Sequence, residues 1–250
     1  RRRFVTAQSD ELVHLDKAAA TMSTMRAPPF ESYIFDLDGT LLNTLGDLAA
    51  CVHLLRAELG LPARDDDFVR RGIGHGLDAL LRHSFSDLAD IAAKEEHRLE
   101  GLRARWRLLY AENLTGHTQP YDGVVETIEA LHACGAPLAI ASNKPERFCH
   151  ELVRHFAWED IFPVVLGGDS APERKPSPAP LLLACAQLGV DARGACMIGD
   201  SPPDILAAQA ANFAASVACT WGYTDEATLR GLGPTRVIDS MRALNPRSGS

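Results

Sequence analysis

The chain has 250 residues, a hydrophobic fraction of 46% and a formal net charge of −8. This length suits one large domain or a domain with an insert, and the hydrophobic fraction is typical of a globular protein. The acidic balance argues against a nucleic-acid partner, which requires clustered lysine and arginine, although one local cationic pocket is enough to bind a small anion. No apolar run has the length of a membrane span, so we expect no membrane partner.

Residues 1–30 differ from the rest of the chain and carry no motif of a functional site. They open with three arginines, include acidic residues that argue against a transit peptide, and contain no apolar centre of a secretory signal. We therefore expect a flexible N-terminal extension.

Cysteine usage indicates a reducing compartment. The six cysteines form no CxxC pair, and no group of cysteines and histidines has the spacing of zinc ligands. This favours reduced, mostly buried thiols in a cytoplasmic protein.

The first expected strand is short and apolar, begins at Ser32 and ends where Asp36 follows it. After it, residues 44–116 carry apolar side chains at helical spacing and nothing that resembles a strand. We therefore predict a helical domain over residues 44–116, inserted between the core segments 31–43 and 117–250.

Helices and short strands alternate after Pro120. The predicted helices are 124–134, 145–155, 178–188 and 204–211, and the predicted strands are 138–141, 164–166, 195–198, 214–217 and 236–238. Such alternation is typical of a parallel sheet with helices on both faces. The predicted fold class is α/β, a doubly wound, Rossmann-like parallel sheet with an inserted helical domain.

Polar residues follow the predicted strands, at the sheet edge where open parallel sheets bind their ligands. They are Asp36, Asp38, Gly39 and Thr40 after the first strand, Ser142, Asn143 and Lys144 after the second, Asp169 and Lys175 after the third, and Asp200 and Asp204 after the fourth. Carboxylates, a hydroxyl, an amide and lysines thus converge, which suits Mg²⁺ together with a phosphate group.

This set of residues predicts phosphoryl transfer. Asp36 and Asp200 can offer side-chain oxygens to Mg²⁺, and a backbone carbonyl near Asp38 can offer another. The Asp36 carboxylate can attack phosphorus and form an aspartyl phosphate, while Asp38 can protonate the leaving alkoxide and then activate water. Gly39 lets the backbone approach the phosphate, and Ser142 with Lys175 can hold the remaining phosphate oxygens.

Each of these features also has a simpler structural explanation. An Asp-x-Asp pair after a strand is common in turns, and Ser142 or Asp200 could cap the helix that follows it. Lys175 could be a solvated surface residue. Their joint occurrence in this order favours the catalytic interpretation.

In four motifs the chain resembles the haloacid dehalogenase-like hydrolase superfamily. The motifs are Asp36-Leu37-Asp38-Gly39-Thr40-Leu41, Ser142 within Ala141-Ser142-Asn143-Lys144, Lys175-Pro176, and Gly199-Asp200-Ser201-Pro202-Pro203-Asp204. The resemblance extends over about residues 32–244. It implies that the helical insert is a C1-type cap that closes over the site and selects the substrate, as lids in general do.

The resemblance also implies a role for each matching residue. Asp36 would be the nucleophile, Asp38 the acid and base, and Ser142 and Lys175 the catalytic phosphate anchors. The magnesium ligands would be Asp36, Asp38 through its carbonyl, and Asp200, while Asp204 would orient Lys175 from outside. Further phosphate or substrate contacts would come from Gly39, Thr40, Asn143 and Lys144.

Within the superfamily the closest likeness is to the phosphoglycolate phosphatases, which implies 2-phosphoglycolate as the substrate. The stretches that carry it are Arg71-Gly72-Ile73-Gly74-His75-Gly76, Tyr121-Asp122-Gly123-Val124, Gly167-Gly168-Asp169, Lys175-Pro176-Ser177-Pro178 and Trp221-Gly222-Tyr223. Arg70, Arg71 and His75 flank the glycine-rich turn and could meet a substrate carboxylate, a task for which arginine is suited, or could belong to a solvated turn.

Other functions remain compatible with the same core. They are a sugar phosphomutase resembling β-phosphoglucomutase, and a pyrophosphate or nucleotide phosphatase. A haloacid dehalogenase proper is disfavoured, because that chemistry uses neither a metal nor a second acid at the position of Asp38. A non-catalytic binding protein on the same fold would be expected to lack one of the catalytic groups, and all of them are present.

Overall fold

The computed structural model describes residues 29–92 and 96–247. Residues 1–28 of the expected extension lie outside the described residues. Within the described part, six strands form one sheet in the order β5-β4-β1-β6-β7-β8, and every neighbouring pair is parallel. The strands are β1 Ser32–Phe35, β4 Leu138–Ala141, β5 Val164–Leu166, β6 Ala195–Gly199, β7 Ala215–Cys219 and β8 Arg236–Ile238.

Strand β1 lies in the middle of the sheet and carries apolar side chains to both faces. Tyr33 pairs with Leu138 of β4 and with Cys196 of β6. Tyr33 and Phe35 belong to one hydrophobic cluster and Ile34 to another, because successive side chains of a strand point to opposite faces. Continuous apolar runs of this kind are typical of parallel strands that are buried on both sides.

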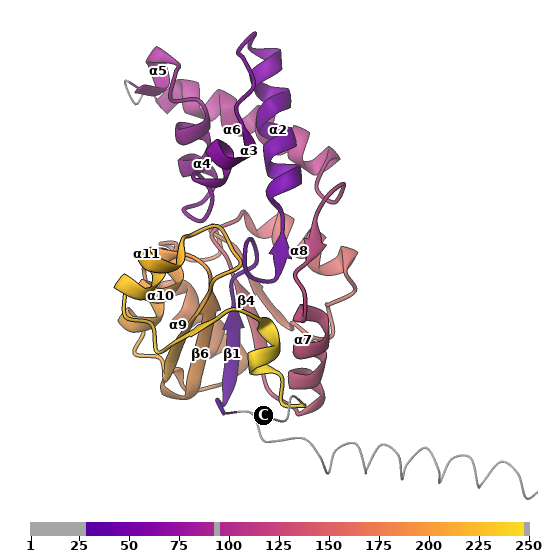
Figure 1. Cartoon of the computed structure of the whole chain (residues 1–250), viewed down its shortest axis with the longest axis vertical. Coiled ribbons are helices and arrows are strands. Elements are labelled where there is room, and N and C mark those ends of the chain that lie inside the picture. Colours follow the sequence, from indigo (N-terminus) through magenta and orange to yellow (C-terminus); the bar gives the residue numbers. More distant parts are fainter. Residues whose placement is uncertain (1–28, 93–95, 248–250) are drawn as a thin grey trace, which may run out of the picture.

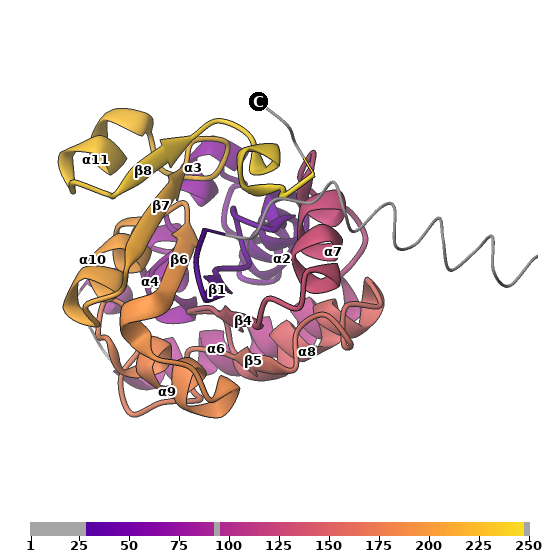
Figure 2. The same cartoon turned by 90° about the horizontal axis from the view of Figure 1, so that it is seen from below.

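Four helices cover the two faces of the sheet. Helices α7 Val124–Ala133 and α8 Glu146–His155 lie on one side, and α9 Ala179–Leu188 and α10 Pro202–Ala210 lie on the other (Figure 2). The doubly wound α/β fold predicted from the alternating pattern is therefore confirmed.

A second group of helices lies beyond the carboxyl ends of the strands (Figure 1). It consists of α2 Leu45–Glu58, α3 Asp66–Arg70, α4 Leu77–Ser84, α5 Ala89–Ala92 and α6 Glu96–Glu112. The buried Arg56 guanidinium joins these helices, because it donates to both carboxylate oxygens of Asp87 and to the carbonyl of Ser84. We refer to α2–α6 as the helical layer.

Two short crossings connect the helical layer to the sheet. Strands β2 Leu42–Asn43 and β3 Gln119–Pro120 pair antiparallel where the chain leaves and re-enters the sheet domain. Next to them the buried Asp47 carboxylate accepts four hydrogen bonds, from the backbone and side chain of His117 at 2.8 and 2.9 Å and from those of Thr118 at 2.8 and 2.6 Å. This pair was not predicted from the sequence, because strands of two residues show no periodicity.

Replacing Asp47 with Ala is expected to lower the free energy of unfolding by about 3 kcal/mol, since buried donors lose a charged acceptor. Urea unfolding followed by circular dichroism measures the change. Asp225→Ala is the matched control: it removes an exposed carboxylate that caps a helix at Thr228 and should cost about 1 kcal/mol. A loss for Asp47→Ala no larger than for this control would contradict the tethering role.

The observed elements differ from the predicted ones mainly at helix ends. Helix α10 begins at Pro202 rather than at Asp204, because proline is tolerated in the first turn and the Asp204 carboxylate accepts from the backbone and hydroxyl of Ser201. Helix α11 Glu226–Gly231 was not predicted, although Asp225 is a recognisable capping residue.

The cysteines agree with the expectation of reduced, mostly buried thiols. All six cysteines are free thiols, and all except Cys134 are buried. Among residues 29–92 and 96–247, no helix has the length and apolar character that a bilayer crossing requires.

Candidate active site

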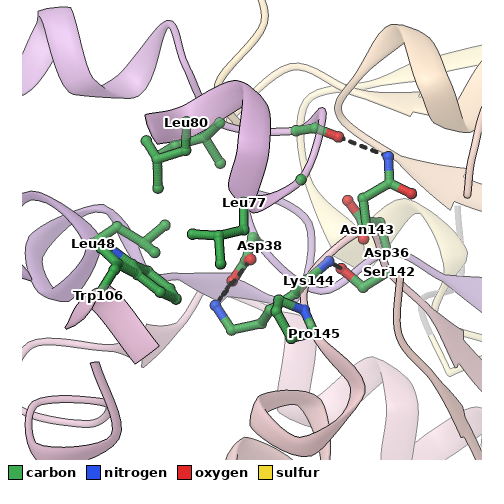
Figure 3. A pocket seen from close by; sticks show the side chains of 13 residues that line it. Asp36, Asp38, Leu48, Leu77, Leu80, Trp106, Ser142, Asn143, Lys144 and Pro145 are labelled. Carbon is green, nitrogen blue, oxygen red and sulfur yellow. Dashed lines mark hydrogen bonds and ion pairs between the residues drawn. The ribbon is translucent and has the colours of Figure 1, made fainter. Parts of the chain in front are cut away.

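A cavity lies between the helical layer and the carboxyl ends of the strands (Figure 3). It has an empty volume of about 420 Å³, part of it open to solvent. The core supplies Asp36, Asp38, Ser142, Asn143, Lys144 and Pro145 to its lining, and the helical layer and its turns supply Leu48, Ile73, Gly74, Gly76, Leu77, Leu80 and Trp106. The cavity thus has a polar floor and mainly apolar walls.

Asp36 stands at the end of β1, where the backbone continues the sheet before it turns. The Asp36 N–H donates to the carbonyl of Ile198 at 2.9 Å, and the following loop is closed by the N–H groups of Leu41 and Leu42, which donate to the carbonyl of Leu37. Gly39 adopts a φ of +88°, which favours glycine. This turn keeps the Asp36 side chain at the sheet edge, only 4% exposed.

Lys175 lies between two buried carboxylates. Its Nζ atom is 2.5 Å from Asp204 Oδ1 and 3.2 Å from Asp36 Oδ1. Burial by itself would lower the pKa of Lys175, but the charges of Asp204 and Asp36 outweigh it and raise that pKa. Lys175 is therefore a buried cation, and Asp204 holds it beside Asp36.

Asp200 is fixed by hydrogen bonds and by two close glycines. Its carboxylate accepts from Thr40 Oγ1 at 2.9 Å and from the Tyr223 N–H at 2.8 Å. A Cβ atom placed on Gly39 or on Gly222 would lie 2.3 Å from Asp200 Oδ2, so neither position has room for a side chain. The loop that contains Gly222 and Tyr223 thus holds Asp200, although sequence analysis assigned it no role.

The buried carboxylates at this edge form a candidate cation site. One oxygen each of Asp36, Asp200 and Asp204 lies within 4.8 Å of the others. Burial, followed by the charges of Asp36 and Asp204, raises the pKa of Asp200 well above its ordinary value. Asp36 Oδ1 has no well-directed hydrogen bond. Within the described part of the chain, Lys175 is the cation that contacts this cluster, and it is shared between Asp36 and Asp204. The donor set therefore fits a hard divalent cation such as Mg²⁺.

Lys144 contacts the second aspartate of the first motif rather than solvent. Its Nζ atom donates to both carboxylate oxygens of Asp38 at 3.0 Å and to Tyr110 Oη at 2.6 Å. Burial, with a smaller contribution from the charge of Asp38, raises the pKa of Tyr110 well above 10, so its hydroxyl stays neutral. Tyr110 could not be recognised from the sequence as a site residue, because an aromatic residue in an amphipathic helix usually indicates core packing.

Ser142 and Asn143 extend the floor of the cavity. The Ser142 N–H donates to the carbonyl of Leu166 at 2.9 Å, which places its side chain beside Asp36. Asn143 Nδ2 donates at 3.0 Å to the carbonyls of Gly74 and Lys175, and so connects the glycine-rich turn to the core. Asp169 instead accepts from the N–H of Glu146 at 2.7 Å, at the start of α8.

The three expected contacts from the glycine-rich turn do not line the cavity in this structure. Arg70 contacts Asp67 at 3.3 Å and the carbonyl of Tyr223 at 3.5 Å, the Arg71 guanidinium lies 5.7 Å from the ring centroid of Phe68, and His75 is exposed. The turn contributes instead the side chain of Ile73 and its glycines.

The chain is similar to known proteins in sequence and in structure. The profile of the family described as haloacid dehalogenase-like hydrolase matches residues 33–218. A phosphoglycolate phosphatase of Nitrosococcus oceani is 35% identical over 212 residues, which cover 84% of this chain and 93% of that protein. One of Chromobacterium violaceum is 36% identical over 220 residues, covering 88% and 97%. A crystal structure from Haemophilus somnus, described as "a predicted phosphoglycolate phosphatase", has a TM-score of 0.77 and 34% identity, covering 85% of this chain and 95% of that one.

Proposed function

This chain belongs to the haloacid dehalogenase-like hydrolase family and to the phosphoric monoester hydrolases, and we propose that it is a magnesium-dependent phosphatase that acts through a phosphorylated Asp36. The observation that carries the proposal is the gathering of Asp36, Asp38, Lys175 and Asp200 at one sheet edge, on the floor of a cavity or directly beneath it.

The proposed reaction has two steps. A carboxylate oxygen of Asp36 forms a bond to the substrate phosphorus as the bond to the leaving oxygen breaks, and Asp38 gives that oxygen a proton. Asp38, now a carboxylate, takes a proton from a water molecule that attacks the aspartyl phosphate. Inorganic phosphate leaves and the Asp36 carboxylate is restored.

The remaining polar groups would hold the phosphate and the metal. Lys175 and the Ser142 hydroxyl would bind the phosphate oxygens, with support from the backbone around Gly39 and Thr40. Asp36 and Asp200, together with the carbonyl of Asp38, would hold Mg²⁺, which offsets the repulsion between the nucleophile and the anionic phosphate. Asp204 would keep Lys175 in place.

We propose 2-phosphoglycolate as the substrate, and the helical layer as the cap that selects it. The names of the relatives from Nitrosococcus oceani and Chromobacterium violaceum support the substrate. The helical layer supports the second part, because its apolar side chains form the cavity walls above Asp36.

A substrate panel with Mg²⁺ tests the proposed function. Release of phosphate from 2-phosphoglycolate, p-nitrophenyl phosphate, β-glucose 1-phosphate, pyrophosphate and a nucleoside monophosphate is measured with Mg²⁺ and with EDTA. We expect activity only with Mg²⁺ and the highest kcat/KM for 2-phosphoglycolate. Isomerisation of β-glucose 1-phosphate without release of phosphate would support a phosphomutase instead, and lack of activity toward every ester would refute the phosphatase.

Replacing Gly222 with Ala is expected to weaken Mg²⁺ binding at least about tenfold, because the new Cβ would lie 2.3 Å from Asp200 Oδ2 and must displace that carboxylate. Titration calorimetry with MgCl₂ measures this without any substrate. Gly231→Ala is the matched control, since nothing lies within 4 Å of its Cβ position. Equal Mg²⁺ affinities for the two variants would show that the loop does not hold Asp200.

A further inference from the structure

We infer that Lys144 binds the carboxylate of the substrate. It thereby determines the specificity of this phosphatase for esters that carry an acid group. The inference rests on the proposed function and adds to it a residue that distinguishes acidic from neutral leaving groups. It comes from the charges that face the cavity, from the fixed position of the Lys144 ammonium, and from the partners that this ammonium has in the structure.

Few charged side chains face the cavity. Among the described residues that line the cavity, the ionisable side chains are Asp36, Asp38 and Lys144, and the walls are largely Leu48, Ile73, Leu77, Leu80, Trp106 and Pro145. A substrate carboxylate that enters such a cavity loses water and needs a cationic partner. Lys144 is the cation that the lining offers, because Arg70, Arg71 and His75 lie outside it.

The ammonium of Lys144 is also held in place. Tyr110 accepts one hydrogen bond from it at 2.6 Å, and the ring centroid of Tyr110 lies 4.5 Å from Nζ. Tyr110 is itself packed between aromatic rings, stacked on Trp106 at 4.4 Å and edge-on to Phe148 at 4.9 Å. Helix α6 of the helical layer, which carries Tyr110, thus fixes the position of the Lys144 ammonium, which belongs to the sheet domain.

The partners of Lys144 allow exchange with a substrate. A lysine ammonium has three N–H donors, and two of the contacts in the structure go to the two oxygens of the single Asp38 carboxylate. A substrate carboxylate can replace one of these contacts while Asp38 keeps the other. One oxygen of Asp38 is then free to face the leaving group, so binding of the acid group and placement of Asp38 occur together.

The test compares two esters that differ only in the charged group. 2-Phosphoglycolate and ethyl phosphate have the same two-carbon chain, but the second carries a methyl group in place of the carboxylate. We expect the wild-type ratio of kcat/KM for 2-phosphoglycolate over ethyl phosphate to fall by roughly 50-fold in Lys144→Met, the loss of one charge-assisted contact. Any disturbance of Asp38 lowers both values and cancels in the ratio, which separates recognition from a purely structural role.

Three further variants complete the experiment. Tyr110→Phe keeps the ring but removes the hydroxyl that holds Lys144, so we expect an intermediate ratio even if Lys144→Met folds poorly. Arg154→Met removes an exposed charge from the last turn of α8 and should leave the ratio unchanged. Arg174→Met tests the adjacent hollow, which Arg107 and Arg174 line, and should also leave the ratio unchanged.

The outcomes separate this inference from the proposed function. A ratio that stays within about threefold of wild type in both Lys144→Met and Tyr110→Phe overturns the inference, as does a collapse of the ratio in Arg174→Met. A wild-type ratio near one also overturns the inference about Lys144, but it does not contradict the proposed phosphatase activity. Failure of the wild-type enzyme to hydrolyse any ester with Mg²⁺ refutes the phosphatase itself.

Discussion

Replacing Asp36 with Asn is expected to lower kcat for phosphate monoesters by at least about 10⁴-fold, because an amide cannot form the covalent intermediate. The chain should still fold. The amide is nearly the same size as the carboxylate it replaces. Its introduction also removes a negative charge that repels the buried Asp200 carboxylate and raises the pKa of that group. Phosphate release from 2-phosphoglycolate and p-nitrophenyl phosphate, at saturating Mg²⁺, measures the effect.

A second readout identifies the intermediate itself. Wild-type enzyme quenched in acid during turnover of a ³²P-labelled ester should retain label that hydroxylamine releases, as an acyl phosphate does. Asp36→Asn should retain none, whereas Asp160→Asn, which changes an exposed aspartate, should behave like wild type. Full activity or labelling in Asp36→Asn would show that Asp36 is not the nucleophile.

Replacing Asp200 with Asn is expected to abolish Mg²⁺-dependent activity and, in EDTA, to make the protein more stable at neutral pH. The pKa of Asp200 is raised well above its ordinary value by burial and by the charges of Asp36 and Asp204. The folded chain therefore binds a proton that the unfolded chain releases near pH 4. Consequently the metal-free wild type should lose stability as the pH rises from about 4 through the raised pKa of the folded state.

Magnesium should reverse this trend, because it binds the ionised carboxylate. At 100 times its Kd, a ligand that binds only the folded state adds about 2.7 kcal/mol, which corresponds to roughly 5–10 °C in Tm for a chain of this size. We expect the difference in Tm between MgCl₂ and EDTA to grow from pH 5 to pH 8 in wild type and to be nearly absent in Asp200→Asn. Calorimetric scans measure it, and equal shifts in the two proteins would exclude Asp200 as a ligand.

The core of the fold could be predicted from the sequence because its signals are local. Strands β1, β4, β5 and β8 lie where short, mainly apolar runs predicted them, and alternation with helices predicted a parallel sheet. Ligands bind at the carboxyl ends of the strands in open parallel sheets, and this rule predicted that Asp36, Lys175 and Asp200 would lie together. The structure brings them together, and their catalytic roles remain predictions.

Features that depend on long-range packing could not be predicted in this way. Tyr110 follows Asp38 by 72 positions and precedes Lys144 by 34, and only the docking of α6 on α8 brings its hydroxyl to the Lys144 ammonium. The hold of Tyr223 and Gly222 on Asp200 likewise arises from the packing of a distant loop. Neither contact leaves a periodicity or a spacing in the chain.

The sheet, the inserted helices and the polar residues at the strand ends could be predicted from the sequence, because apolar periodicity and the residues that follow a strand are local features of the chain. What those polar residues face depends on tertiary packing. Lys144, expected only as a phosphate or substrate contact, is a buried lysine between Asp38 and Tyr110, and the arginines of the glycine-rich turn lie outside the cavity. Neighbouring residues do not show this, because the burial and pairing of a charged side chain depend on which distant elements pack around it.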